Sequence, residues 1–158
     1  MNSKIHWKKL LGCVAVPLAV GGLSALVTKE GMKAFELVDK PPLTPPQTVF
    51  PIAWSVLYAM MGTASYQILR ADAPQEKKNA ALGFYAAQLV FNFFWSVFFF
   101  NGQRYLLSFV WLCALWVLIA VTVKKFSEIR GSAGWLLLPY LLWVSFAGYL
   151  NYGVYLLN

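Results

Sequence analysis

Charged residues are missing from most of this chain. The 13 Lys or Arg and 6 Asp or Glu residues all lie outside five uncharged, apolar stretches of 19 to 26 residues each. The stretches cover residues 10–28, 47–69, 79–100, 105–123 and 132–157. A soluble five-helix core would carry charged residues on the outer faces of its helices. The absence of charge from all five stretches therefore argues against a soluble bundle.

The stretches have the length of membrane-spanning helices. About 20 helical residues cross a hydrocarbon core roughly 30 Å thick. Strands of a membrane barrel would alternate polar and apolar residues, and the run from Phe91 to Phe100 does not alternate. The apolar share of 59% exceeds the roughly 45–50% of soluble domains. We expect an all-α, polytopic membrane protein, a five-transmembrane-helix bundle in which residues 1–158 form a single membrane domain.

Residues that carry acid–base or metal chemistry are also scarce. The only histidine, His6, lies on the N-terminal tail, so the sequence predicts no metal site. Cys13 and Cys113 fall within spans, where a disulfide would be unusual, and we interpret them as small packing residues. Ion-coupled transporters and proton relays place charged residues or histidine within the membrane. Their absence here argues against energised ion coupling.

The net charge of +7 reflects membrane topology rather than nucleic-acid binding. Nine Lys and Arg residues fall on the N-terminal side of the predicted spans and four on the opposite side. This asymmetry predicts a cytoplasmic N-terminus and an outer C-terminus. A signal peptide is the alternative for the first span, but the run is long and has no clear small-x-small cleavage site, which favours an uncleaved helix.

Amide, indole and phenol groups supply the polarity within the spans, and helical spacing gathers them into stripes. One reading is a pocket for a flat, largely apolar molecule; the other is hydrogen bonding between packed helices. For Trp7, Trp111 and Trp135 we favour anchoring at the membrane interface. The stripes comprise Trp54, Tyr58, Met61 and Ser65, then Gln88, Asn92 and Trp95, then Trp143, Ala147, Leu150 and Asn151.

The connection at residues 29–46 ends in a proline-rich segment. Proline removes backbone donors and stiffens an extended chain. An ordinary linker is one interpretation. A semi-rigid flap over the mouth of the bundle is the other, with Pro41, Pro42, Thr44, Pro45 and Pro46 as its candidate residues.

Three segments resemble the TspO/MBR family, the tryptophan-rich sensory proteins related to the mitochondrial translocator protein, also called the peripheral benzodiazepine receptor. The first is Lys40–Pro46 followed by Phe50–Tyr58. The second is Gln88–Ser96 followed by Phe98–Phe100. The third is Pro139–Ala147 followed by Leu150–Tyr152. The resemblance runs from about residue 10 to the end of the chain.

This resemblance implies a five-helix bundle with a pocket beneath the first loop, which binds porphyrins such as protoporphyrin IX or haem without requiring a cofactor. It makes Trp54 and Trp143 the stacking walls and Gln88 and Asn92 polar contacts. Light- and oxygen-dependent breakdown of protoporphyrin has been proposed for bacterial members, which makes these tryptophans candidate catalytic residues, neither of them firm. The family's pocket positions correspond to Trp54, Gln88, Asn92, Trp95, Trp143 and Ala147.

Two positions of the first loop depart from the family pattern, because Pro42 and Leu43 stand where a serine and an aromatic residue are common. No basic residue follows Tyr152, so sterol binding is not favoured. The short, uncharged tail favours a bacterial cell membrane. Ala86, Val90 and Phe91 resemble a small-residue dimer contact of bacterial relatives, and we expect a homodimer.

Three functional classes therefore remain open. The first is a sensor or regulator that binds a tetrapyrrole within the lipid bilayer. The second is a passive transporter of porphyrin or another hydrophobic solute. The third is a porphyrin-consuming enzyme.

Overall fold

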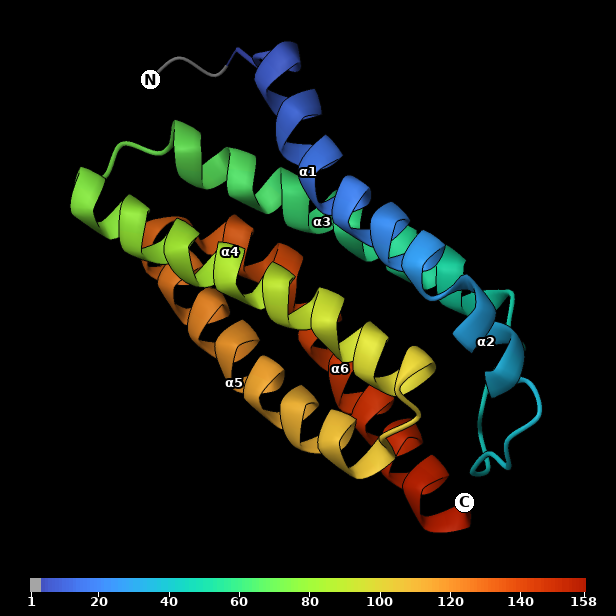
Figure 1. The fold of residues 1–158 in the computed structure, drawn as a ribbon. Coiled ribbons are helices and arrows are strands. Elements are labelled where there is room, and N and C mark those ends of the chain that lie inside the picture. The colour runs from blue at the N-terminus through green and yellow to red at the C-terminus, as the bar shows by residue number, and fades with distance from the viewer. Residues whose placement is uncertain (1–3) are drawn as a thin grey trace.

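The computed structural model describes residues 4–158, and within that range the chain forms helices and no strand. Five helices of 21 to 27 residues run side by side, and one short helix caps an end of the bundle (Figure 1). In chain order they are α1 (Trp7–Val27), the short α2 (Lys29–Phe35), α3 (Val49–Arg70), α4 (Gln75–Ser96), the π-helical turn η1 (Val97–Asn101), α5 (Tyr105–Ile129) and α6 (Gly131–Leu157).

Four helices in the described range are long and apolar enough to cross a membrane: α1, α4 together with η1, α5 and α6. The chain is thus an all-helical integral membrane protein. The fifth expected span, α3, is 22 residues long but is not among these four. Its apolar residues are interrupted by Trp54, Tyr58 and Gln67, among others.

The helices differ from the predicted stretches mainly at their ends. α1 begins at Trp7, before the basic pair Lys8 and Lys9, and α5 continues past Lys124 to Ile129. The predicted stretches end at charged residues because charge is unfavourable in hydrocarbon. The helices continue further because their backbone hydrogen bonds can also form in water. The predicted loop 29–46 also differs, because α2 occupies its first part.

α1 approaches α3 closely at two glycines. A Cβ atom at Gly62 would overlap the backbone of Cys13 and Val14, and one at Gly21 would overlap the ring of Tyr58. Small residues permit such approach in membranes, where van der Waals contact is a main source of helix association. This contact holds α1 against the rest of the bundle.

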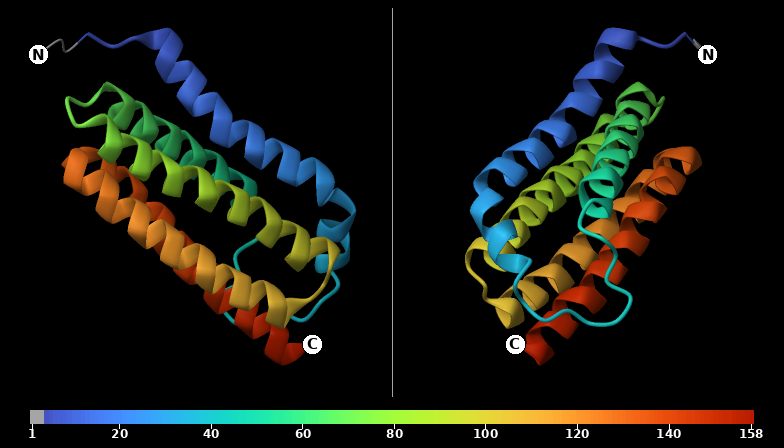
Figure 2. Two further views of the ribbon diagram at one scale, coloured as in Figure 1. Left: turned by 60° about the vertical axis from the view of Figure 1, so that its left-hand side comes forward. Right: turned by 90° about the vertical axis from the view of Figure 1, so that its right-hand side faces the viewer.

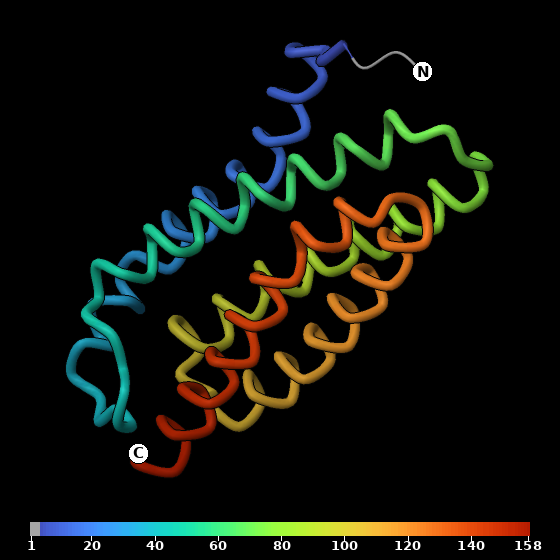
Figure 3. The backbone as a smooth tube through the Cα atoms, turned by 180° about the vertical axis from the view of Figure 1, so that it is seen from behind, coloured from blue at the N-terminus to red at the C-terminus, as the bar shows by residue number. Residues whose placement is uncertain are grey.

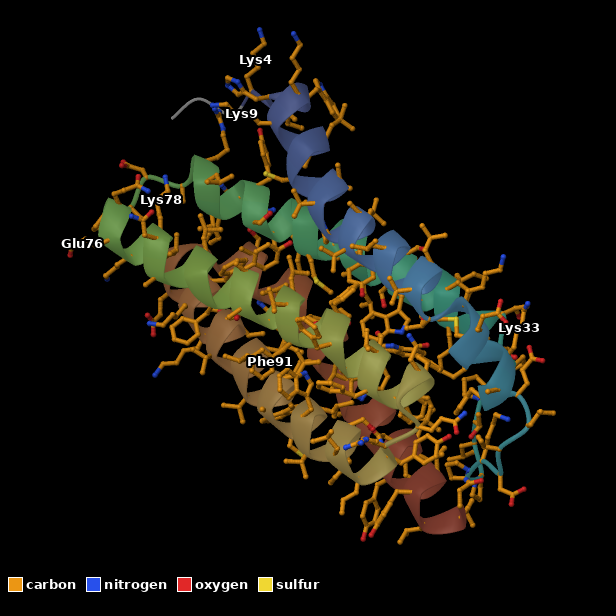
Figure 4. All side chains as sticks on the ribbon, in the orientation of Figure 1. Lys4, Lys9, Lys33, Glu76, Lys78 and Phe91 are labelled. Atoms are coloured by element: carbon orange, nitrogen blue, oxygen red, sulfur yellow. The ribbon has the colours of Figure 1, made fainter. Side chains whose placement is uncertain are left out.

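The two ends of the bundle carry different segments. The N-terminus and the α3–α4 and α5–α6 turns share one end, whereas α2, the segment after it and the C-terminus share the other (Figures 2 and 3). Lys4, Lys9 and Lys78 lie at the first end and Lys33 at the second (Figure 4). The predicted grouping of basic residues by end matches this arrangement.

Replacing Gly62 by alanine should destabilise the bundle, because the added methyl group meets backbone that cannot rotate away. The expected loss is about 1–3 kcal/mol in the free energy of unfolding, measured in mixed detergent micelles. Gly83→Ala is the matched control: a Cβ there meets no atom within 4 Å, so this variant should be neutral or slightly stabilised. Equal stability of the two variants would contradict the close contact.

Candidate ligand-binding cavity

A cavity of about 410 Å³ lies within the bundle, bounded by residues of α1, α2, α3, α6 and the α4–η1 segment. Its volume is in the range of roughly 300–1,000 Å³ typical of small-molecule sites. No Asp, Glu, Lys, Arg or His lines it. The cavity suits a ligand whose buried part is apolar and uncharged, because burying an unpaired charge costs far more than burying apolar surface.

Aromatic rings from α3 and α6 form one wall. Trp54 stacks on Tyr58 with ring centroids 5.5 Å apart and 27° between the planes. Trp143 meets Trp54 edge-on at 6.4 Å and 90°, and Phe50 meets Trp143 at 6.0 Å. The Nε1 atom of Trp143 is buried and has no hydrogen-bond partner among the described residues, 4–158. A flat ligand in the cavity would find π-faces for stacking and this indole N–H as a donor.

The opposite boundary comes from α2 and η1. Met32 and Phe35 of α2 line the cavity, and Phe35 packs on Phe99 at 5.3 Å and on Phe100 at 5.4 Å between ring centroids. Asn101 Nδ2 donates to the carbonyl oxygen of Val27 at 3.0 Å, which joins η1 to the end of α1. π-helical turns are rare and are frequently found at functional sites.

Gln88 and Asn92, the expected polar ligand contacts, are not among the residues that line the cavity. Both are 1% exposed and hydrogen-bond to the same phenol. Tyr140 Oη donates to Gln88 Oε1 at 2.6 Å and accepts from Asn92 Nδ2 at 2.8 Å. Tyr58 Oη donates to Asn92 Oδ1 at 3.3 Å. The two amides therefore join α3, α4 and α6 beside the cavity wall.

The other predicted ligand contacts, Trp54, Tyr58, Trp95, Trp143 and Ala147, do line the cavity. The indole of Trp95 is committed within the protein: its Nε1 donates to Asn151 Oδ1 at 3.0 Å, and its ring stacks on Phe99 at 5.4 Å. Trp95 can therefore offer a ligand its ring surface but not its donor.

The proline-rich segment lies against the end of α6, and none of Pro41, Pro42, Thr44, Pro45 and Pro46 lines the cavity. Tyr149 Oη donates to the Pro42 carbonyl at 2.7 Å. The side chain of Asn158 hydrogen-bonds to both the backbone N–H and the carbonyl of Asp39. The segment is thus pinned to the C-terminal end of the chain. The cavity itself is covered by α2, which the proline pattern did not predict.

The sequence analysis did not identify several residues that line the cavity, among them Met32, Phe35, Phe99 and Phe100. α2 is one short helix of seven residues, too short for a periodic signal, and it lies in a stretch rich in charge. Phe99 and Phe100 belong to a run of aromatic residues that matches the family pattern, but which of these rings turn inward depends on the π-helical turn. No signal in the sequence marks that turn.

The proposed dimer residues are divided between two environments. Ala86 is exposed and Val90 is 53% exposed on α4. Phe91, labelled in Figure 4, stacks on Trp111 at 4.3 Å and 13°. Trp111 also donates to the Phe91 carbonyl at 2.8 Å; it therefore packs between α4 and α5, unlike the exposed Trp7 and Trp135.

Removing the Tyr140 hydroxyl should destabilise the bundle, because Gln88 loses a donor and Asn92 loses an acceptor. For Tyr140→Phe we expect a loss of about 1–2 kcal/mol in the free energy of unfolding in mixed micelles. Tyr155→Phe, at a position 39% exposed near the C-terminus, is the control and should match the wild type. A Tyr140→Phe variant as stable as the control would contradict a supporting role for this network.

Known proteins resemble this chain along nearly its full length. The model of the TspO/MBR family matches residues 13–157. A tryptophan-rich protein TspO from Chlorobaculum tepidum is 37% identical over 159 residues, covering 100% of this chain and 99% of that protein. A tryptophan-rich sensory protein from Cereibacter sphaeroides is 36% identical over 124 residues, which are 78% of this chain and 76% of that protein. The translocator protein of Bos taurus is 34% identical over 148 residues, with coverages of 92% and 88%. The aromatic cavity thus lies in an integral membrane protein that belongs to the TspO/MBR family.

Proposed function

We propose that this protein binds a tetrapyrrole, protoporphyrin IX or haem, within the membrane and acts as a sensor or regulator. The observation that carries the proposal is the cavity of about 410 Å³, free of charged lining residues and walled by Trp54, Tyr58 and Trp143. Large, rigid π-surfaces favour a flat conjugated ligand. The name of the Cereibacter sphaeroides relative, a tryptophan-rich sensory protein, supports a sensory role.

The ligand would be held mainly by ring contacts. Trp54 and Tyr58 offer two stacked rings, and the perpendicular Trp143 closes the wall at its edge. Trp143 Nε1, which has no acceptor in the part of the chain that the structure describes, would donate to an oxygen or nitrogen of the ligand. Such a pairing would add orientation, because a buried donor left without an acceptor costs about 1–3 kcal/mol.

Passive transport of a porphyrin or another hydrophobic solute is the second candidate. The bovine relative's name, translocator protein, favours it. The same cavity would then be an intermediate binding site on the path of the solute across the bilayer. Under this alternative, vesicles that contain the protein would release a trapped porphyrin faster than empty vesicles, which simple binding would not produce.

The proposal places all five long helices across the bilayer, with α3 as the fifth span. α3 packs between α1 and α6, so its less apolar faces are covered by protein. With more Lys and Arg at the end that holds the N-terminus, that end would face the cytoplasm of a bacterial cell. The α2 end, with the cavity near it, would face the outside.

A titration with protoporphyrin IX in the dark tests the proposed ligand, with tryptophan fluorescence as the readout. The wild type should show saturable quenching, and the Trp54→Phe, Trp143→Phe double variant should bind at least tenfold more weakly because it loses both indole walls. Trp135→Phe is the control, since Trp135 is 73% exposed and does not line the cavity. Quenching that never saturates, or that is equal in all three proteins, would refute tetrapyrrole binding in this cavity.

We also propose a homodimer formed through the exposed face of α4. Val90→Arg should shift the protein from dimer to monomer, because a charge placed on an apolar helix contact in lipid is left unpaired. Val110→Arg, at a position of similar exposure on α5, is the control and should remain dimeric. The measurement is the molecular mass of each protein in lipid nanodiscs. If both variants are dimers, or if the wild type is a monomer, the α4 face is not the dimer interface.

A further inference from the structure

The residues that line the cavity differ sharply in exposure from helix to helix. Those from α4 and η1 are buried or nearly so, as with Trp95 and Phe99, and those from α6 include the buried Ala147, Leu150 and Asn151. The exposed lining residues within the membrane helices come only from α1 and α3. The cavity wall is therefore best covered on its α4 and α6 sides and least covered where α1 and α3 border it.

The exposed lining residues form one stripe on each helix. Leu18, Gly22 and Ala25 follow at i, i+4 and i+7 on α1, and Pro51 and Ser55 follow at i and i+4 on α3. Helical geometry places the α3 pair on the same flank as Gly62, the glycine at which α3 touches α1. The two stripes thus border the same seam between the helices.

Two consecutive glycines of α1 have different surroundings, because neighbouring residues of a helix point about 100° apart around its axis. At Gly21 a Cβ atom would overlap the ring of Tyr58, whereas at the next residue, Gly22, a Cβ atom would meet nothing within 4 Å. Gly22 nevertheless lines the cavity. Gly22 is also exposed, so α1 leaves the cavity wall thinly covered at this residue.

The route past α2 is more obstructed. Phe35 is packed on Phe99 and Phe100, and Asn101 ties η1 to the end of α1. The following segment is pinned by Asn158 and Tyr149. Entry from water would require breaking these contacts, whereas entry between α1 and α3 requires none of them to break.

From this geometry we propose that the seam bordered by Leu18, Gly22, Ala25, Pro51 and Ser55 is a lateral portal, through which the cavity receives planar, mostly apolar molecules from the bilayer. The inference rests on the proposed function, because it takes this cavity as the ligand site. The uncharged lining is consistent with it: a molecule that dissolves in hydrocarbon needs no charged partner at any point of this path.

The test measures association rates in lipid vesicles with protoporphyrin IX dimethyl ester, an uncharged porphyrin that partitions into the bilayer. Gly22→Leu places a bulky side chain in the seam, and Ser55→Leu does so from the other helix. In both, the association and dissociation rates should fall together, each at least fivefold. Gly12→Leu is the matched control, a glycine on α1 that is exposed, equally open at its Cβ position and outside the cavity lining; it should bind at the wild-type rate.

Asn158→Ala separates the two routes, because it frees the segment that follows α2 without touching the cavity. The lateral route predicts an unchanged association rate for this variant. Faster association of Asn158→Ala, or wild-type association rates in both seam variants, would overturn the portal while leaving binding itself intact. Weaker binding of Gly22→Leu through faster dissociation alone would also overturn it, since the residue would then be only part of the wall. A wild type that does not bind the ester or protoporphyrin IX saturably would instead refute the proposed function, and the portal with it.

Discussion

The hydrogen bonds that Tyr140 makes with Gln88 and Asn92 are the interaction on which the cavity depends. They join α4 and α6 at 2.6 and 2.8 Å, and the bond from Tyr58 to Asn92 brings in α3. In hydrocarbon no water can replace a lost partner, so these groups favour one arrangement of the three helices. Trp54 packs against both tyrosines, and its position in the cavity wall follows from that arrangement.

Because few unpaired polar groups line the cavity, it selects ligands mainly by their shape. Within it the amides and most donors are already paired inside the protein, and charged residues are absent from its lining. What remains for a ligand includes aromatic surface and the indole N–H of Trp143, which has no partner among residues 4–158. A site of this kind discriminates by shape and flatness, because stacking is available to any conjugated ring and directional contacts are few.

α1 is the least buried of the long helices. Only Pro17 and Ser24 of its 21 residues are buried, and its contacts with α3 include close approaches at Gly21 and Gly62. On the surface of a soluble protein such an exposed apolar helix would be unfavourable, but in lipid its outer surface has a matching solvent. Because α1 lies outside the main core, which is formed mostly by α3, α4, α5 and α6, it can border an opening without loss of that core.

The sequence by itself determined the class of the molecule and most of its helices. Uncharged stretches of spanning length predict α1, α4, α5 and α6 because lipid admits helices and rejects charge. Helical spacing placed Trp54 and Tyr58 on one face, and the family resemblance added Trp143 as a second stacking wall. Only the tertiary structure decided which polar residues face the cavity. Gln88 and Asn92 have the spacing of ligand contacts but meet Tyr140, 48 or more residues away in the chain. The inward turn of Phe99 and the cover formed by Phe35 likewise depend on contacts between distant segments, which helical periodicity cannot encode because it describes one helix at a time.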